Sequence, residues 1–272
     1  MPPMCTGTRT SEVLYTSELL HLRNVCCHEA RGANAPEEEE TWPTLVIPLR
    51  GAFLWHVASR EALLDSNTIA LFSRLATYRV SHPFEGGDRC LALAFSREVL
   101  GDAFGTDEIS PKYWIFPVEW RTQIHRMLAG ICDPKSVLRI EESAVELLSL
   151  LASIRPQKTA RSERDVVRNL REVMNARIEM HDTLAQLADL VAYSPFHAAR
   201  VFRAETGITL HQYRHAIRLM QGLEQLRFGN DAIAQIAVAL GFHDQSHFSA
   251  SFCRAFGVAP SSLRCKKSRR SC

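Results

Sequence analysis

Cysteine and histidine are the residue types in this chain that most readily support metal or nucleophilic chemistry. The N-terminal half carries a group of them on or beside short apolar stretches: Cys26, Cys27, His28, His56, His82 and Cys90. Such thiol and imidazole groups could gather around a soft metal ion. However, the eight cysteines of the chain form no CxxC pair, so a closed zinc site is not indicated. Packing residues are the favoured interpretation, and no metal, cofactor or catalytic residue is predicted.

A second kind of chemistry, hydrogen bonding to a flat polar edge, is suggested near the C-terminus. Phe248, Phe252 and Phe256 recur at steps of four and predict the buried face of a helix. The residues left on the outer face are small or polar: Gln245, Ser246, Ser249 and Ala250. This pattern is typical of a helix that enters a groove rather than a core.

Two similar helical pairs are predicted to position such outward faces. In the second pair, Gly241 ends a short apolar helix and Asp244 caps the next one. In the first pair, Ser194 is the cap and Pro195 occupies the first turn. Residues 210–228 between them show a helical apolar repeat, which at roughly 1.5 Å per residue spans about 28 Å. That length is close to the distance of roughly 34 Å between successive major-groove faces of B-DNA.

These residues 164–264 resemble the DNA-binding domain of the AraC/XylS family of bacterial transcription regulators. The resemblance is carried, in order, by SPFHAARVF, ETGITLHQY, GF, DQSHFSASF and FGVAPSSLR. Two helix-turn-helix units with their connecting helix are far more specific than a single such motif. The resemblance implies a sequence-specific transcriptional regulator that binds double-stranded DNA, works with RNA polymerase and a second copy of itself, and has no enzymatic activity.

The resemblance also implies which side chains reach DNA. In the first unit they are Phe196, Ala199 and Arg200, and in the second Gln245, Ser246, His247 and Ala250. Arg200 can bond guanine O6 and N7 together, which is worth about 1–3 kcal/mol of discrimination, and Gln245 can bond adenine N6 and N7. Plainer alternatives are that Arg200 binds only phosphate, that Phe196 is partly core, and that His247 packs, caps or touches phosphate.

Five positions in this region bear on the resemblance, and Ala250 and Cys253 depart from it. Ala250 and Cys253 stand where many members have basic residues, so the first unit is predicted to dominate base recognition. Arg218 and Arg264 fall where the family has arginines that tie helices together. Gly222 lies inside the connecting helix, where it costs roughly 1 kcal/mol relative to alanine.

Charge divides the chain into two parts. Residues 1–154 carry 14 basic and 20 acidic side chains, and residues 155–272 carry 18 and 10, so the net charges are −6 and +8. A basic part attached to an acidic one is typical of a nucleic-acid binder with a regulatory module. The alternative is that two solvated surfaces simply differ.

Residues 11–95 predict strands, and their number and shortness suggest a barrel or sandwich. The stretches are 19–27, 44–49, 52–57, 68–72, 77–80 and 89–95. The family resemblance implies a cupin-like β-barrel that senses a small-molecule effector, with a pocket that Phe53, Trp55, Tyr78 and His82 could line; core packing is the alternative for each.

The HxH-plus-Glu spacing of metal-bearing cupins is missing, which weakens a cupin-type metalloenzyme as the alternative function. A non-enzymatic interaction protein is a further alternative. The acidic run 36–40 is most simply a solvated loop.

The predicted fold class is therefore α+β, and the chain divides into four parts. Residues 1–154 form the sensing and dimerisation domain, with the barrel at about 11–117 and two antiparallel helices at about 118–154. Residues 155–162 form a linker. Residues 163–265 form the DNA-binding domain, with units at about 183–204 and 231–254, and 266–272 form a basic tail. Without a signal peptide or membrane span, the sequence predicts a cytoplasmic protein with reduced cysteines.

Overall fold

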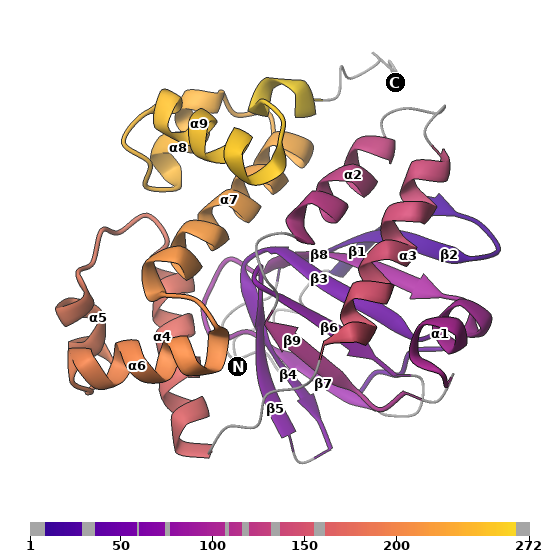
Figure 1. The fold of residues 1–272 in the computed structure, drawn as a ribbon, viewed down its shortest axis with the longest axis horizontal. Helices are drawn as coiled ribbons and strands as arrows, with labels where there is room; N and C mark the ends of the chain where they lie inside the picture. The colour runs from indigo at the N-terminus through magenta and orange to yellow at the C-terminus, as the bar shows by residue number, and fades with distance from the viewer. Residues whose placement is uncertain are drawn as a thin grey trace, which may run out of the picture.

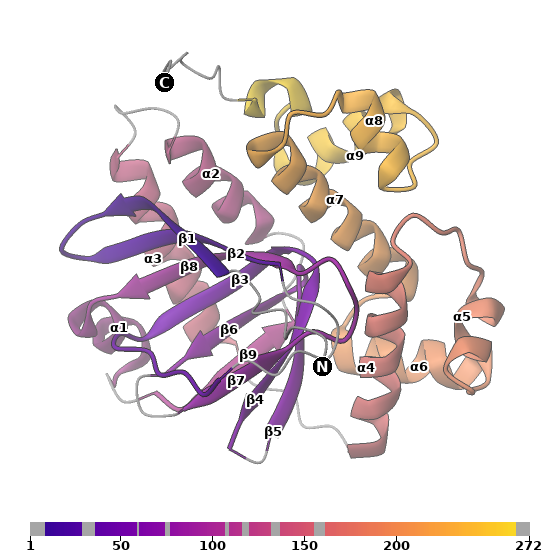
Figure 2. The same cartoon turned by 180° about the vertical axis from the view of Figure 1, so that it is seen from behind.

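Strands occupy one side of the molecule and a group of helices the other, in the computed structural model shown in Figures 1 and 2. The structure describes residues 9–28, 36–58, 60–73, 77–106, 109–115, 120–131, 137–154 and 161–264, with side chains from Asp165 onward in the last range. The part of the predicted linker that covers residues 155–160 and the basic tail lie outside the described residues. The last two linker positions, 161–162, already belong to a helix.

The strand part contains the following elements: β1 (Arg9–Thr16), β2 (Leu20–Cys27), β3 (Thr44–Arg50), β4 (Ala52–Val57), β5 (Arg60–Asp65), β6 (Thr68–Phe72), β7 (Tyr78–Ser81), β8 (Asp88–Phe95), α1 (Arg97–Phe104) and β9 (Lys112–Ile115). Two helices follow, α2 (Arg121–Ile131) and α3 (Val137–Ser153). The six predicted strands and the predicted helix pair are therefore confirmed. Sequence patterning missed β1, β5, β9 and α1.

The strands form two separate sheets rather than the closed barrel that the family resemblance implied. One sheet has the order β1-β2-β8-β3-β6-β9, and the other has the order β5-β4-β7. The chain changes sheet between β3 and β4, where Gly51 stands between them, and again at the β5–β6 turn. Within the described ranges no ladder joins an edge of one sheet to an edge of the other, so the arrangement is an open sandwich. The mixed α and β class is confirmed, and the barrel closure is wrong.

The C-terminal part consists of helices: α4 (Arg161–Ala176), α5 (Leu184–Leu190), α6 (Pro195–Thr206), α7 (Leu210–Phe228), α8 (Ile233–Ala239), α9 (Gln245–Phe256) and the 3-10 turn η2 (Pro260–Leu263). Figure 1 shows α7 running between the α4–α6 group and the α8–α9 group. The predicted connecting helix is thus confirmed. Among the described residues, no helix combines the length and apolar character needed to cross a membrane.

Side-chain caps fix the starts of these helices, and the one at Ser194 was predicted from the sequence. The Ser194 hydroxyl accepts the N–H of His197 at 3.3 Å, with Pro195 at the first turn of α6. The Thr209 hydroxyl accepts the N–H of Gln212 at 3.2 Å, and the Gln212 side chain accepts the Thr209 N–H at 2.9 Å, which completes a capping box on α7. Each bond satisfies a backbone donor that the helix itself leaves unpaired, so local chemistry sets these boundaries.

Gly222, which looks like a weak point of α7 by helix propensity, has a packing reason. The glycine is buried, and a β-carbon added to it would lie 2.8 Å from Cε2 of Phe248 on α9. Phe248 has no free space to retreat, because it is fully buried between Phe242 and Phe252 at ring distances of 5.1 and 5.5 Å. The absence of a side chain at position 222 therefore lets α9 pack closely on α7.

We expect Gly222→Ala to lower the free energy of unfolding by roughly 1–2 kcal/mol, although alanine is the better helix former. Overpacking a core costs about 1–3 kcal/mol, which exceeds the gain of about 1 kcal/mol in helix propensity. The matched control is Gly101→Ala in α1, where an added β-carbon meets nothing within 4 Å and a gain is expected. Urea denaturation measures the free energy of unfolding of both variants. Stabilisation by Gly222→Ala would show that the Phe248 ring can shift to make room for the added methyl group.

Candidate functional site

The first candidate recognition helix, α6, presents a polar and an aromatic group on its outer side. Phe196 is 78% exposed, which removes the alternative that it is partly core. Arg200 is exposed, and Ala199 is half-buried between them and the core side of the helix. The opposite side buries the apolar residues Ala198, Val201 and Phe202. The Arg200 guanidinium forms no hydrogen bond or ion pair with the residues that the structure describes, so its donors face solvent.

The second candidate recognition helix, α9, has the predicted outward face. Gln245, Ser246, His247 and Ala250 are exposed, while Phe248, Phe252 and Phe256 are buried. The carboxylate of Asp244 accepts the backbone N–H of His247 at 2.8 Å, and this bond, together with His243, lowers the pKa of Asp244. The His247 ring lies 5.4 Å from that of Phe242, edge to face, so this histidine packs as well as facing outward.

Arg218 of α7 ties the segment that precedes the first helical unit to the second unit. Its Nε and one terminal nitrogen donate to the carbonyls of Ile178 and Met180, each at 2.8 Å, and the other donates to the carbonyl of Gly241 at 3.1 Å. Burial and the neighbouring charge of Arg214 lower the pKa of Arg218 to about 10. Since Ile178 and Met180 precede the first unit and Gly241 lies within the second, the expected structural role of Arg218 is confirmed. Arg264 likewise donates to the carbonyl of Asp231.

A basic hollow of about 330 Å³ lies between α5 and α7, with His181 and Asp182 also on its wall, and sequence reasoning missed it. Four of its residues recur along one side of α7: His211, Arg214, His215 and Arg218. The helical spacing of basic residues at 211, 214, 215 and 218 was the available signal. Burial and surrounding positive groups lower the pKa of His215 to about 4, so this ring is neutral near pH 7. Asp182 is the acidic residue on the wall of the hollow.

A buried polar cluster fastens the sandwich to the helices. The carboxylate of Asp65, in the β5–β6 turn, pairs with Arg171 of α4 at 3.2 Å and accepts the Tyr213 hydroxyl of α7 at 2.8 Å and the Asn175 amide at 3.0 Å. Asn67 of the same turn donates to the carbonyl of Tyr213 at 3.0 Å. In the sequence, residues 65–67 were interpreted only as a break between two strands.

The cluster is held in place by charge in a dry environment. Asp65 and Tyr213 are fully buried, and Arg171 is 3% exposed. Burial alone would lower the pKa of the Arg171 guanidinium, but the adjacent charge of Asp65 outweighs it and raises that pKa. Such a pair is stable only while both partners and their hydrogen bonds remain.

A second contact joins the larger sheet to the far part of α7. Glu224 lies 3.1 Å from Arg89 and 3.8 Å from Arg50, and Arg89 also stands over the ring of Phe228 at 4.7 Å. Burial raises the pKa of Glu224, and the two arginines oppose that shift. Further along, His125 of α2 packs 6.3 Å from Phe256 of α9. The sandwich therefore touches both ends of the helix that carries the two units.

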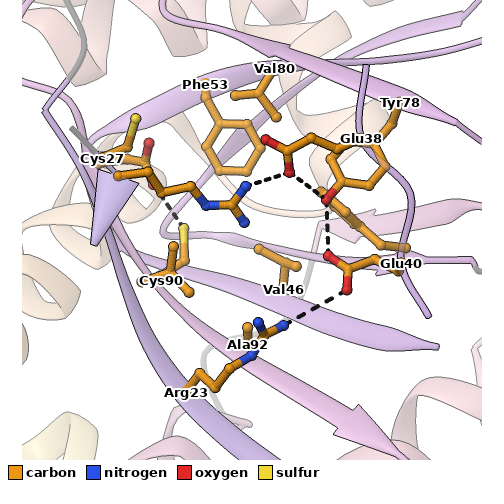
Figure 3. A pocket seen from close by; sticks show the side chains of 14 residues that line it. Arg23, Cys27, Glu38, Glu40, Val46, Phe53, Tyr78, Val80, Cys90 and Ala92 are labelled. Carbon is orange, nitrogen blue, oxygen red and sulfur yellow. Dashed lines mark hydrogen bonds and ion pairs between the residues drawn. The ribbon is translucent and has the colours of Figure 1, made fainter. Parts of the chain in front are cut away.

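A cavity of about 70 Å³ lies inside the sandwich, and Figure 3 shows its wall. Of the four predicted pocket residues, Phe53 and Tyr78 line it. Trp55 lies outside the lining and stacks on Phe72 at 4.7 Å, and His82 is buried beside Asp88. Burial would lower the pKa of His82, but hydrogen bonds to Asp88 and Cys27 outweigh it and raise the pKa to about 10.

The acidic run 36–40 contributes to this cavity and is more than a solvated loop. The Tyr78 hydroxyl lies 3.0 Å from Glu38 and 2.9 Å from Glu40. Arg9 pairs with Glu38, and Arg23 lies 3.8 Å from Glu40. Burial, followed by the two carboxylates, raises the pKa of Tyr78. No pattern in the sequence indicated that two of the four glutamates would meet arginines from β1 and β2, which are distant along the chain.

Two helix-turn-helix units on one connecting helix, with exposed polar outer faces, define a helix-turn-helix protein of the nucleic-acid-binding class. The family model described as a helix-turn-helix domain matches residues 187–266. Over this C-terminal part, the match and the similarity to HTH-type transcriptional activators support the predicted resemblance to the AraC/XylS family of transcriptional regulators.

Similar proteins cover only part of this chain. The HTH-type transcriptional activator RhaS of Pectobacterium carotovorum subsp. carotovorum is 30% identical over 141 residues, which are 50% of this chain and 50% of that protein. RhaR of the same organism is 40% identical over 63 residues, 23% of this chain and 22% of that protein. The chain thus matches about half the length of these relatives or less. The solved C-terminal domain of AraT from Geobacillus stearothermophilus is 27% identical, with a TM-score of 0.37, and the match covers 39% of this chain and 91% of that one.

Proposed function

We propose that this protein is a sequence-specific transcriptional regulator that places α6 and α9 in two successive major-groove segments of double-stranded DNA. The observation that carries the proposal is the exposure of Arg200 and Gln245 on two helices that are joined to the same α7. A recognition helix needs a free polar outer face and a buried apolar face, and both helices have them.

The two helices have different parts in this recognition. Arg200 reads a guanine through its two-pronged hydrogen bonds, and Phe196 and Ala199 beside it supply apolar contacts to base edges. Gln245 reads an adenine in the same paired way, while Ser246, His247 and Ala250 contact the groove wall and backbone. Because Ala250 offers no hydrogen-bonding group, the first unit contributes most of the base discrimination.

The side of α7 that carries the basic hollow extends this surface, with the exposed His211 as the group that faces DNA phosphate. The four α7 residues of the hollow lie on the side of that helix opposite to Tyr213 and Glu224, which contact the sandwich. With 3.6 residues per turn, positions 211, 214, 215 and 218 share a face, and positions 213 and 224 lie on the other. The sandwich therefore does not cover this side of the connecting helix, although Arg214 and Arg218 on it are themselves buried.

Regulation belongs to the same proposal. A small-molecule effector enters the sandwich cavity and changes how the sandwich holds α4 and α7 through Asp65 and Glu224. An effector can move this balance only by its difference in affinity between the two arrangements. The proposal also includes a second copy of the chain and RNA polymerase as partners, and a cytoplasmic location, all of which were predicted from the sequence. The proposed regulator has no enzymatic activity. The divisions at residues 154, 162 and 265 are proposed as its domain limits.

Salt dependence of DNA binding tests the proposal. The full chain is used to select fragments from the genome that encodes it, and affinity for a selected fragment is measured by fluorescence anisotropy between 50 and 200 mM salt. A protein with 6–10 phosphate contacts is expected to lose about 10³–10⁵ in affinity over that range. A scrambled fragment of equal length is the control. No preference for the selected fragment, or affinity that is independent of salt, would reject DNA recognition.

A further inference from the structure

Three potential metal ligands meet inside the sandwich, although Cys27 is distant in the sequence from His82 and Asp88. Cys27 ends β2, His82 directly follows β7, and Asp88 begins β8. All three are buried, and one ligand atom from each lies within 4.8 Å of those of the other two. The β2–β8 ladder aligns Cys27 with Asp88, so the sheet register itself brings the sulfur and the carboxylate together.

A glycine makes this close approach available. Gly87, just before Asp88, has a φ of +62°, and a β-carbon there would lie 1.9 Å from the carbonyl oxygen of Cys27. A residue with a side chain would be strained in that backbone conformation and would also push the turn away from β2. The turn 86–88 therefore seats Asp88 against Cys27 in a way that an ordinary turn would not.

The ligand types select a class of ion. A thiolate, an imidazole and a carboxylate together suit Zn²⁺ and Co²⁺, whereas Mg²⁺ and Ca²⁺ prefer oxygen ligands alone. The groups now bond to one another: His82 Nε2 lies 2.7 Å from Asp88 Oδ1, and the Cys90 thiol donates to Asp88 Oδ2 at 3.1 Å. A metal ion binds such a set by replacing the protons that its ligands share.

The charge of the ligands and the position of the site beside the cavity both favour a divalent cation. One thiolate and one carboxylate carry two negative charges, which a divalent cation neutralises without leaving a buried net charge. Cys27 and Asp88 both line the sandwich cavity, as does Cys90, so a metal held by three protein ligands would keep its fourth position toward that cavity. Figure 3 shows Cys27 and Cys90 on the same side of the cavity.

We propose that Cys27, His82 and Asp88 bind a thiophilic divalent cation, with Zn²⁺ as the best match, and that Cys90 positions Asp88 through its hydrogen bond. The proposal does not depend on DNA recognition, because the site lies wholly within the sandwich.

Cobalt absorption of the full chain tests the site. The background protein carries serine at Cys253, which is exposed, and at the cysteines outside the described residues: Cys5, Cys132, Cys265 and Cys272. After metal removal by a chelator, it is titrated with Co²⁺. We expect a thiolate-to-cobalt charge-transfer band that saturates at one equivalent and disappears when Zn²⁺ is added. Since only Cys26, Cys27 and Cys90 remain in this background, the absence of the band overturns the proposal without any change at the site.

Single substitutions in the same background assign the ligands. Cys27→Ser is expected to abolish the band, and His82→Gln and Asp88→Asn to weaken cobalt binding at least tenfold. Cys90→Ser is expected to keep the band with affinity reduced about 10–100-fold, as for a group that orients a ligand. The matched control is Cys26→Ser. Adjacent residues of a strand point to opposite faces of the sheet, so the Cys26 side chain is expected to point away from the site that Cys27 faces. Loss of the band in Cys26→Ser but not in Cys27→Ser would overturn the assignment.

Discussion

Asp65→Ala is expected to lower the free energy of unfolding by about 3–5 kcal/mol, the loss typical of removing one partner from a buried ion pair. The substitution would leave the Arg171 guanidinium charged and buried, and it would also remove the acceptor of the Tyr213 hydroxyl and the Asn175 amide. Among the described residues, Arg171 would keep a bond to the Leu63 carbonyl and one to the Tyr213 oxygen. Such neutral contacts cannot neutralise a full charge in a buried site.

The matched control is Glu61→Ala, because Glu61 joins the same two elements at the surface. Its carboxylate pairs with Arg168 of α4 at 2.6 Å, but both side chains are about one-third exposed. Exposed pairs contribute roughly 0–1 kcal/mol, so little change is expected. Urea denaturation followed by circular dichroism and by tryptophan fluorescence compares the two variants. Equal losses would mean that burial of the Asp65–Arg171 pair is not what holds the sandwich to α4.

Arg200→Ala is expected to weaken binding to a selected DNA fragment by about 5–150-fold, the equivalent of 1–3 kcal/mol for one paired base contact. It is also expected to relax the preference at a single base position, because the alanine methyl group cannot distinguish base edges. Because Arg200 is exposed, only a small loss of stability is expected, so an effect on affinity would report recognition rather than folding.

Gln245→Ala is expected to have a smaller effect than Arg200→Ala, since a neutral amide makes weaker bonds than a guanidinium. Arg97→Ala provides the control for charge, because Arg97 is exposed on α1 in the sandwich part. Affinities for the selected fragment and for fragments with single base changes are measured at one salt concentration. Equal losses for the Arg200 and Gln245 variants would contradict the dominance of the first unit. A uniform loss across all fragments for Arg200→Ala would assign that side chain to phosphate.

If the sandwich and the helices are coupled as proposed, Asp65→Ala and Arg200→Ala should affect different properties of the protein. Asp65→Ala acts on the attachment of the sandwich and is expected to change regulation more than intrinsic DNA recognition. Arg200→Ala acts on recognition and leaves the attachment intact. Their effects on affinity should add in the double variant, because the two residues have no contact and no common partner in the described structure.

The helical half could be predicted largely from the sequence because its determinants are local. Ser194, Thr209 and Asp244 cap the helices that follow them by bonding to backbone groups three residues away. Gly222 is the instructive exception. Propensity identified it as a cost, but the reason for it is the ring of Phe248, which is 26 positions further along the chain and reaches it only through packing.

The strand half could be predicted less well, because sheets are built from distant partners. β1 is mostly exposed and therefore lacks the apolar alternation that marks a half-buried strand. The strands that were recognised gave no information on which edges would pair, so closure into a barrel rested on resemblance alone. Periodicity identifies strands, but sheet order depends on contacts between segments far apart in the sequence.

The sequence alone determined the two recognition helices, their caps, the helix between them and the outward positions of Arg200 and Gln245, since all of these depend on interactions within a few turns of chain. Only the tertiary structure decided that the sandwich is open, that Asp65 meets Arg171 and Tyr213, and that Cys27, His82 and Asp88 share one buried place. Those groups are polar, and Asp65 and Cys27 are each distant in the sequence from the two residues that they meet, so nothing local in the chain specifies which partner will neutralise them. Folding brings them together because a charge or hydrogen-bonding group that leaves water must find a partner.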